Sequence, residues 1–104
     1  MEPALFIGWT TVGSEGAAEQ LAKALVEAGL AACVQIESGV VSLYQWEGKH
    51  CRESEWRLMV KFAAAKGEAL EAYLIGAHPY ATPEWVVVRA EAVAPAYLRW
   101  VLGN

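Results

Sequence analysis

Residues 30–62, LAACVQIESGVVSLYQWEGKHCRESEWRLMVKF, decide the fold that the sequence predicts. Between Glu53 and Phe62, apolar residues alternate with charged or longer ones, which is the period-2 pattern of a strand with one buried face. Leu30–Trp46 is rich in β-branched and aromatic residues and predicts one long strand, bent or bulged at Gly39. Because Glu47-Gly48-Lys49 is a turn signal, the two strands form a hairpin.

The first strand of this hairpin is too long for one small domain to cover. From Ala31 to Trp46 it spans on the order of 50 Å at ~3.3 Å per residue, whereas an ordinary strand spans ~17 to 20 Å. Its distal half therefore overhangs the domain and carries Leu43, Tyr44 and Trp46. Such a hairpin aggregates unless another chain pairs with it, so we expect a homo-oligomer.

The segments around the hairpin predict the remaining elements. Ala4–Val12 is apolar and β-prone, and a helix follows from the N-cap Ser14 to the glycine at position 29. A second amphipathic helix runs from about Lys66 to the glycine at position 76, and a short closing helix starts at Pro95. Between them, Glu84–Glu91 predicts a strand whose apolar run suggests burial on both faces. The order β-α-β-β-α-β-α is that of a ferredoxin-like α+β domain.

Composition limits the classes to which the protein can belong. With 104 residues, of which 56% are hydrophobic, the chain has the size of one domain and too much apolar surface for disorder. We expect a single domain over residues 1–104. The net charge of −4 and the lack of Lys/Arg clusters argue against nucleic acid as a partner.

Residue usage also bears on location and on catalysis. The start of the chain has no basic segment like that of a signal peptide, and no apolar run reaches the ~18 residues of a membrane span. We therefore expect a cytoplasmic protein with reduced thiols and no membrane partner. The chain has no Asp, no Gly-rich phosphate loop and no evident Ser–His or Cys–His pair, so we expect no enzymatic activity.

Four segments resemble, in order and spacing, the signatures of the CutA divalent-cation-tolerance proteins. They are Leu30–Ile36, Ser42–Lys49, His78–Glu84 and Tyr97–Trp100. The resemblance implies a tightly packed homotrimer in which the long hairpins interlock, with a shape like that of PII signalling proteins. It also implies a role in tolerance to copper and other divalent metal ions, with no cofactor required beyond such a metal.

The resemblance also identifies candidate metal ligands, and most of them are replaced here. The best-known branch of the family has a Cys at the end of the first strand and two adjacent His before Pro-Tyr. Thr10, Ala77 and His78 occupy these positions, so one of three ligands remains. His78 is the best copper candidate, on the hypothesis that a trimer brings copies of His78, or His78 with Glu84, within reach of one ion across a subunit boundary. The alternative is that His78 binds carbonyl groups at a helix end.

The other soft-metal residues are weaker candidates. Cys33 lies inside a strand, where a small thiol is ordinarily packed in the core. His50 and Cys51 are adjacent, so strand pairing points them to opposite faces and they cannot close on one ion.

A second candidate site is a cleft between subunits, formed by aromatic and charged residues of the hairpin and of the loop between Pro79 and Pro83. Two interpretations remain open: these groups hold the trimer together, or they form a pocket in which Lys61 binds a small anion, as in PII-like sensors. The candidate cleft residues are Tyr44, Trp46, Lys49, Glu55, Lys61, Tyr80 and Glu84.

Overall fold

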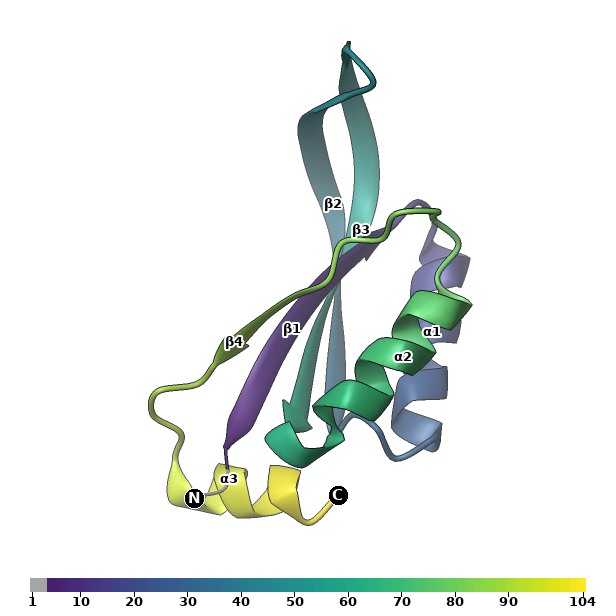
Figure 1. The fold of residues 1–104 in the computed structure, drawn as a ribbon. Helices are drawn as coiled ribbons and strands as arrows, with labels where there is room; N and C mark the ends of the chain where they lie inside the picture. Colours follow the sequence, from purple (N-terminus) through teal and green to yellow (C-terminus); the bar gives the residue numbers. More distant parts are fainter. Residues whose placement is uncertain (1–3) are drawn as a thin grey trace.

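The computed structural model describes residues 4–104, and its centre is a four-stranded antiparallel sheet in the order β2-β3-β1-β4. Helices α1 and α2 cover one side of the sheet, and α3 lies at the end of the sheet where β1 begins (Figure 1). The mixed α+β class and the predicted order of elements agree with the structure. The elements are β1 (Leu5–Val12), α1 (Glu15–Glu27), β2 (Cys33–Trp46), β3 (Lys49–Ala63), α2 (Gly67–Ala77), β4 (Val86–Arg89) and α3 (Pro95–Leu102), with a short 3-10 turn at Ala64–Lys66.

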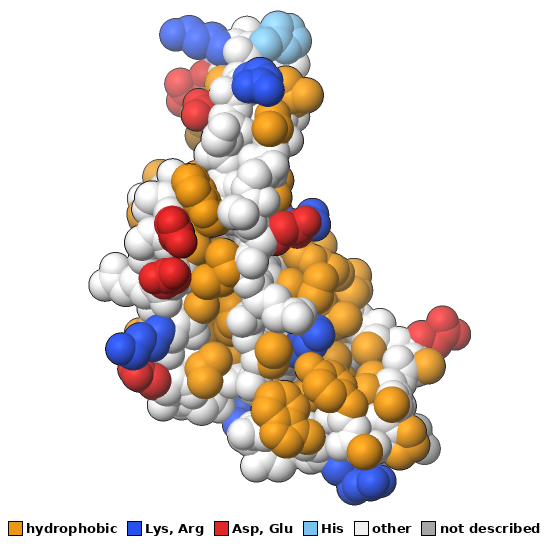
Figure 2. Space-filling model, turned by 180° about the vertical axis from the view of Figure 1, so that it is seen from behind, with side chains coloured by type: hydrophobic (Ala, Val, Ile, Leu, Met, Phe, Trp, Pro, Cys, Tyr) orange, Lys and Arg blue, Asp and Glu red, His pale blue; other side chains and the backbone are white. Residues whose placement is uncertain are grey.

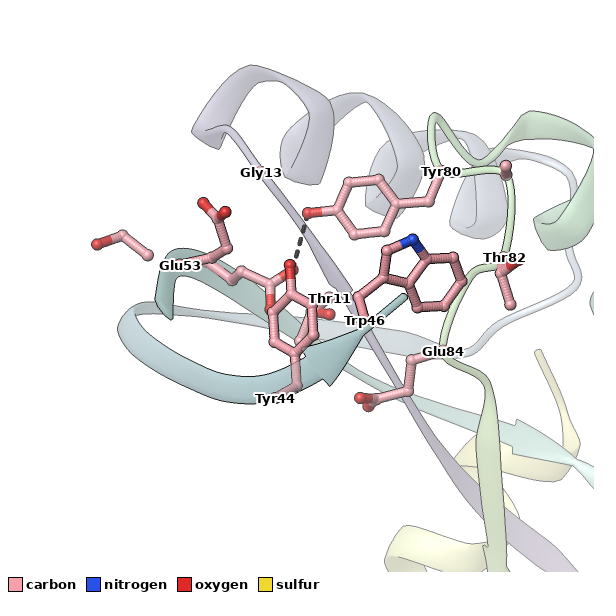
Figure 3. A pocket seen from close by; sticks show the side chains of 11 residues that line it. Thr11, Gly13, Tyr44, Trp46, Glu53, Tyr80, Thr82 and Glu84 are labelled. Carbon is pink, nitrogen blue, oxygen red and sulfur yellow. Dashed lines mark hydrogen bonds between the residues drawn. The ribbon is translucent and has the colours of Figure 1, made fainter. Parts of the chain in front are cut away.

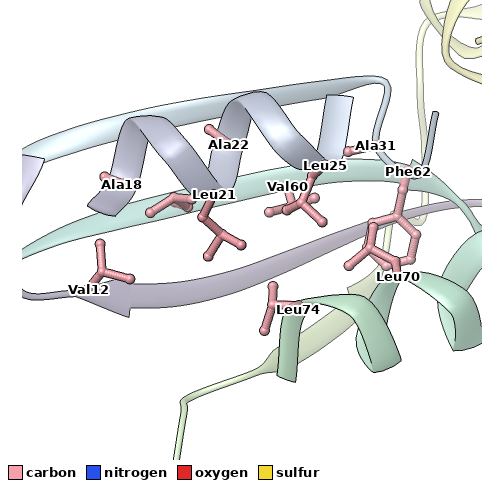
Figure 4. Close-up of a cluster of buried hydrophobic side chains, with 11 residues drawn as sticks. Val12, Ala18, Leu21, Ala22, Leu25, Ala31, Val60, Phe62, Leu70 and Leu74 are labelled. Carbon is pink, nitrogen blue, oxygen red and sulfur yellow. The ribbon is translucent and has the colours of Figure 1, made fainter. Parts of the chain in front are cut away.

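The core lies between the sheet and the two helices (Figure 4). The alternation predicted for β3 is confirmed there, since Leu58, Val60 and Phe62 are all fully buried. Phe62 meets the ring of Phe6 edge-on, with centroids 5.9 Å apart, and stacks on Trp85 at 6.0 Å. These three rings close the core at the edge where β4 joins the sheet.

Gly8 of β1 leaves the space that Trp85 fills. A Cβ added at Gly8 would lie 2.2 Å from Cη2 of Trp85, too close for any real contact. We expect Gly8→Ala to push the indole off Phe62 and to lower the free energy of unfolding by about 1–3 kcal/mol. Urea denaturation tests this, and Gly16→Ala, whose added Cβ meets nothing within 4 Å, is the control. Equal stability of Gly8→Ala and the wild type would contradict the tight fit.

The second strand of the hairpin is longer than predicted, the first is shorter because it starts at Cys33 and not at Leu30, and the two are joined by a tight turn. β2 and β3 pair from Cys33 opposite Lys61 to Trp46 opposite Lys49, so β3 starts at Lys49 and not at Glu53. The two turn residues, at positions 47 and 48, have φ angles of 50° and 78°. Positive φ at both positions is typical of a type I′ turn, whose twist lets the strands pair right up to the turn.

A β-bulge interrupts the hairpin where the sequence predicts it. The pairing shifts between Glu37 and Val40, and Gly39 has a φ of 74°. Beyond this point the hairpin projects from the body of the chain (Figure 1), and the described chain, hairpin included, measures 44 × 26 × 23 Å along its principal axes. The overhang predicted from strand length is therefore present.

The prediction for the last strand is wrong in length and in burial. β4 comprises only Val86–Arg89 and pairs with β1 alone, as an edge strand. Val86, Val87 and Val88 are exposed by 54%, 37% and 44% in the single chain. The two helices do not cover this edge of the sheet (Figure 1), and in this segment only the preceding Trp85 packs against the core.

Apolar side chains are also exposed on other parts of the surface. Figure 2 shows apolar side chains gathered over the lower body and along the hairpin. The most exposed is Leu43 at 76%, and Trp100 of α3 is 49% exposed while its ring stacks on Tyr97. In residues 4–104, no helix has the length and apolar character needed to cross a membrane.

Candidate functional site

A cleft of about 620 Å³ lies between the distal hairpin and the loop that follows α2 (Figure 3). Five of the seven predicted cleft residues line it: Tyr44, Trp46, Glu55, Tyr80 and Glu84. The sequence did not indicate the other lining residues, which are Thr11, Gly13, Glu53, Ser54, Ala81 and Thr82.

The bulge and the strand register place the hairpin residues of the cleft. After Gly39, Tyr44 and Trp46 alternate onto the same face of β2. On that face Ser42 stands opposite Glu53, and Val40 stands opposite Glu55. Residues opposite each other in an antiparallel pair project to the same side, so two aromatic rings and two carboxylates share one surface.

Tyr80 joins the loop to this surface. Its hydroxyl donates a hydrogen bond of 2.7 Å to Oε2 of Glu55, whose side chain is almost wholly buried. Burial would raise the pKa of Glu55, but hydrogen bonds from the hydroxyls of Ser42, Tyr80 and Thr11 outweigh it and leave this pKa below its ordinary value. Burial and the Glu55 carboxylate raise the pKa of Tyr80. The pair is therefore a fixed carboxylate bound to a phenol that keeps its proton.

The cleft is acidic. Glu53, Glu55 and Glu84 line it, and among the described residues the lining has no Lys, Arg or His. Burial and then the Glu55 carboxylate raise the pKa of Glu84, and the charge of Arg57 offsets this only in part. Arg57 itself donates two hydrogen bonds to Glu37, of 3.1 and 2.6 Å. The negative charge of the cleft therefore has little compensation from the subunit.

The two predicted lysines do not line the cleft, although Lys49 is on the same face of the hairpin as its pairing partner Trp46. Lys49 is at the hairpin tip, opposite Trp46, and is not among the lining residues. Lys61 pairs with Cys33 near the base of the sheet, and its ammonium lies 5.5 Å from the centre of the Tyr97 ring. Within one chain, Lys61 and the cleft therefore do not form one pocket, and an anion site between subunits that uses Lys61 stays a prediction.

The ring of His78 is fully engaged by hydrogen bonds. The backbone N–H of Tyr80 donates to Nδ1 at 3.0 Å, so the proton of the neutral ring is on Nε2. Nε2 lies 3.0 Å from the carbonyl oxygen of Thr11 and 3.0 Å from Oγ1 of Thr10. Burial lowers the pKa of His78 and so favours this neutral form. His78 does stand at the end of α2, as the alternative interpretation predicts, but the carbonyl group it binds is that of Thr11 at the end of β1 and not one of the helix.

A metal ion does not fit His78 as it stands. Neither ring nitrogen has a free lone pair directed outward, and Glu84 faces a cleft that His78 does not line. Thr10 and His78 do meet, but through a hydroxyl in place of a thiol. Within residues 4–104 no three His, Cys or acidic side chains are grouped so as to hold a metal ion.

The remaining soft ligands are spread along the hairpin. Cys33 pairs with Lys61 at its base, and Cys51 pairs with Tyr44 near its tip. His50 pairs with Gln45, so it and Cys51 alternate to opposite faces of the strand.

Protonation of His78 is expected to destabilise the subunit. Because the folded pKa lies below the ordinary value of 6.5, the stabilisation is complete above about pH 6.5 and is lost as the pH falls through the folded pKa. We expect the midpoint of urea unfolding to fall between pH 7.5 and pH 5.5, and to fall less in His78→Gln, which does not titrate. Equal falls in both proteins would show that His78 is not the group responsible.

Comparisons with known proteins give consistent matches. Residues 6–104 match the family described as CutA1 divalent ion tolerance protein. A CutA homolog of Xenopus laevis is 36% identical over 97 residues, which cover 93% of this chain but only 64% of that protein, just under two thirds. The structure of the divalent cation tolerance protein Cut A1 of Thermus thermophilus superposes with a TM-score of 0.92 at 37% identity, covering 96% of this chain and 97% of that one. A protein of Archaeoglobus fulgidus described as a periplasmic divalent cation tolerance protein CutA gives a TM-score of 0.89 at 31% identity, covering 93% and 94%.

Proposed function

The chain belongs to the CutA1 divalent ion tolerance family, and on that premise we propose that it acts in cellular tolerance to copper and other divalent metal ions as a homotrimer of ferredoxin-like subunits. The observation that carries the proposal is the match over residues 6–104, nearly the whole chain. We treat residues 1–104 as one functional domain without catalytic activity.

The surface of the subunit supports self-assembly. Trp46 and Leu43 stand on the overhanging hairpin, and the edge strand β4 presents three exposed valines. Exposed apolar surface of this extent marks an interface. Sedimentation velocity at micromolar concentration should report a particle of three times the 11.3 kDa of one chain. A solitary 11.3 kDa particle would refute the trimer.

The proposed response to copper does not pass through His78. Because both of its ring nitrogens are bound within the subunit, His78→Ala should bind Cu²⁺ as tightly as the wild type in a calorimetric titration. His50→Ala, at the exposed hairpin tip, is the matched histidine control. A loss of affinity in His78→Ala alone would restore His78 as a ligand.

The cleft favours a second role, that of a PII-like small-molecule sensor. A concave site with aromatic walls and a few fixed polar groups is the usual form of a ligand pocket. Here Tyr80 and Glu55 supply the fixed groups, while Trp46 and Tyr44 supply the walls. A thermal-shift screen of nucleotides, carboxylates, amines and metal ions tests this role, and a screen without any shift would count against it.

We also propose that the protein works in the cytoplasm. Its two cysteines are unpaired and lie at opposite ends of the hairpin, Cys33 at the base and Cys51 near the tip, as expected in a reducing compartment. Cell fractionation with an antibody against the protein tests this location, and recovery outside the cytoplasm would contradict it.

A further inference from the structure

The cleft is lined by aromatic rings and by carboxylates, and both kinds of group attract cations. Tyr44, Trp46 and Tyr80 turn their rings toward the same space, and the carboxylates of Glu53 and Glu84 lie at its sides (Figure 3). Aromatic faces attract cations through their quadrupole, and carboxylates attract them by charge. An anion would meet repulsion from both.

The cleft is poorly suited to coordinate a bare metal ion. Hard divalent cations need several oxygen ligands within about 2.0–2.6 Å of one point. In residues 4–104 the carboxylates do not form such a group of three, and the buried Glu55 is already held by the hydroxyl of Tyr80. The carboxylates therefore surround a volume and do not converge on a point.

A larger cation with a carbon skeleton matches that volume. The cleft of about 620 Å³ falls within the range of roughly 300–1,000 Å³ typical of sites for organic ligands. Trp46 and Tyr44, exposed by 51% and 43%, offer apolar ring faces that a metal ion would leave uncovered. Glu55 is fixed at the base of the cleft, so its charge stays in place whether or not a ligand is bound.

We propose that the cleft binds a small organic ammonium ion, with the charged nitrogen beside Glu84 and the carbon groups against Trp46 and Tyr44. This inference rests on the sensor role proposed above and names the class of its ligand. It is independent of the copper response, which has its own titration.

The test compares the binding of a cation with that of an uncharged analogue of the same shape. Choline and 3,3-dimethylbutan-1-ol have nearly the same shape, but a carbon replaces the charged nitrogen in the second. Isothermal titration of the assembled wild-type protein should show choline binding about tenfold or more tighter than the alcohol, the scale of a partly desolvated cation–π contact. Copper(II) and succinate are titrated in parallel as a metal ion and a small anion.

Variants locate the binding site. Glu84→Gln, which keeps the shape of the side chain, and Trp46→Leu, which removes an aromatic face, should each weaken choline binding about three- to tenfold, because each removes one attraction. Trp46 also stands at the proposed interface between subunits, so Glu84→Gln decides the test if Trp46→Leu alters the assembly. Glu91→Gln removes the same charge from an exposed position outside the lining and should leave the affinity within about twofold. Circular dichroism and sedimentation of each variant show that fold and assembly are kept.

The results of these titrations distinguish a failure of the ammonium-binding inference from a failure of the proposed sensor role. Equal binding of choline and the alcohol, or choline binding unaffected by Glu84→Gln, overturns the inference. Succinate binding in the absence of choline binding, and sensitive to Trp46→Leu, also overturns it but leaves a sensor. If none of the probes binds and the wider thermal-shift screen finds no ligand, both the inference and the sensor role fail. The proposed response to copper is tested separately, by the Cu²⁺ titration.

Discussion

Trp46→Glu is expected to break the proposed trimer into subunits of 11.3 kDa. Trp46 stands on the hairpin that projects from the subunit, and 51% of its surface is exposed in the single chain. Burying such a side chain against a neighbour contributes roughly 1.5–3 kcal/mol, and burying an unpaired carboxylate in its place costs several more. The loss occurs at three equivalent interfaces, so its effect on assembly is multiplied.

Two further variants make this test specific. Trp46→Glu also adds a charge beside Glu53, so Leu43→Glu is made on the other face of the same strand, at a residue exposed by 76%. We expect it to dissociate the trimer as well. Tyr73→Glu places the same charge on α2, 41% exposed and away from the hairpin, and should stay trimeric. Sedimentation velocity distinguishes the species, and an intact trimer in both hairpin variants would contradict the assigned interface.

Phe62→Ala is expected to lower the free energy of unfolding by about 3–5 kcal/mol, the largest effect we expect within the subunit. Phe62 is 1% exposed and sits between Phe6 and Trp85, so its removal leaves a cavity and strips two rings of their partner. A domain of this size has a total stability of only about 5–15 kcal/mol.

Matched controls show whether the cavity is the cause. Phe62→Leu keeps much of the volume and should cost clearly less than Phe62→Ala. Tyr73→Ala removes a ring of similar size from the surface of α2 and should change stability little. Urea unfolding is compared at one protein concentration, because the stability of an oligomer depends on concentration. Equal losses for Phe62→Ala and Tyr73→Ala would contradict the central place of Phe62.

The sequence was sufficient for the elements whose patterns depend on local chemistry. Alternation fixes the face of β3, the glycine at position 39 marks the bulge, and Ser14 caps α1 through a 3.1 Å bond from the N–H of Ala17 to its Oγ. β4 could not be predicted in the same way. An apolar run such as Val86–Val88 has the same composition whether it is covered by its own helices or left for another chain, and only the tertiary arrangement decides.

The sequence predicts which face of a strand each candidate site residue occupies, but not how far apart these residues lie. Glu55 and Lys61 do share a face of β3, yet six residues at ~3.3 Å each separate them by about 20 Å, so Lys61 falls outside the cleft. Glu53 was missed although its alternation with Glu55 was visible, because nothing local showed that Ser42 would stand opposite it. The partners of His78 come from the end of β1, 67 and 68 residues away, beyond any pattern in the sequence.

The bulge at Gly39 divides the long hairpin into a proximal part that belongs to the core and a distal part that projects from it. Below it, the strands share a core with the helices; above it, they pair only with each other, from Val40–Glu55 to Trp46–Lys49, and Glu55 joins them to the loop after α2 through Tyr80. A bulge bends its strand and increases the local twist. A chain without this residue could keep all of those pairs and its own interior, yet direct the tip along a different line. One residue thus sets the direction in which the hairpin leaves the body of the chain.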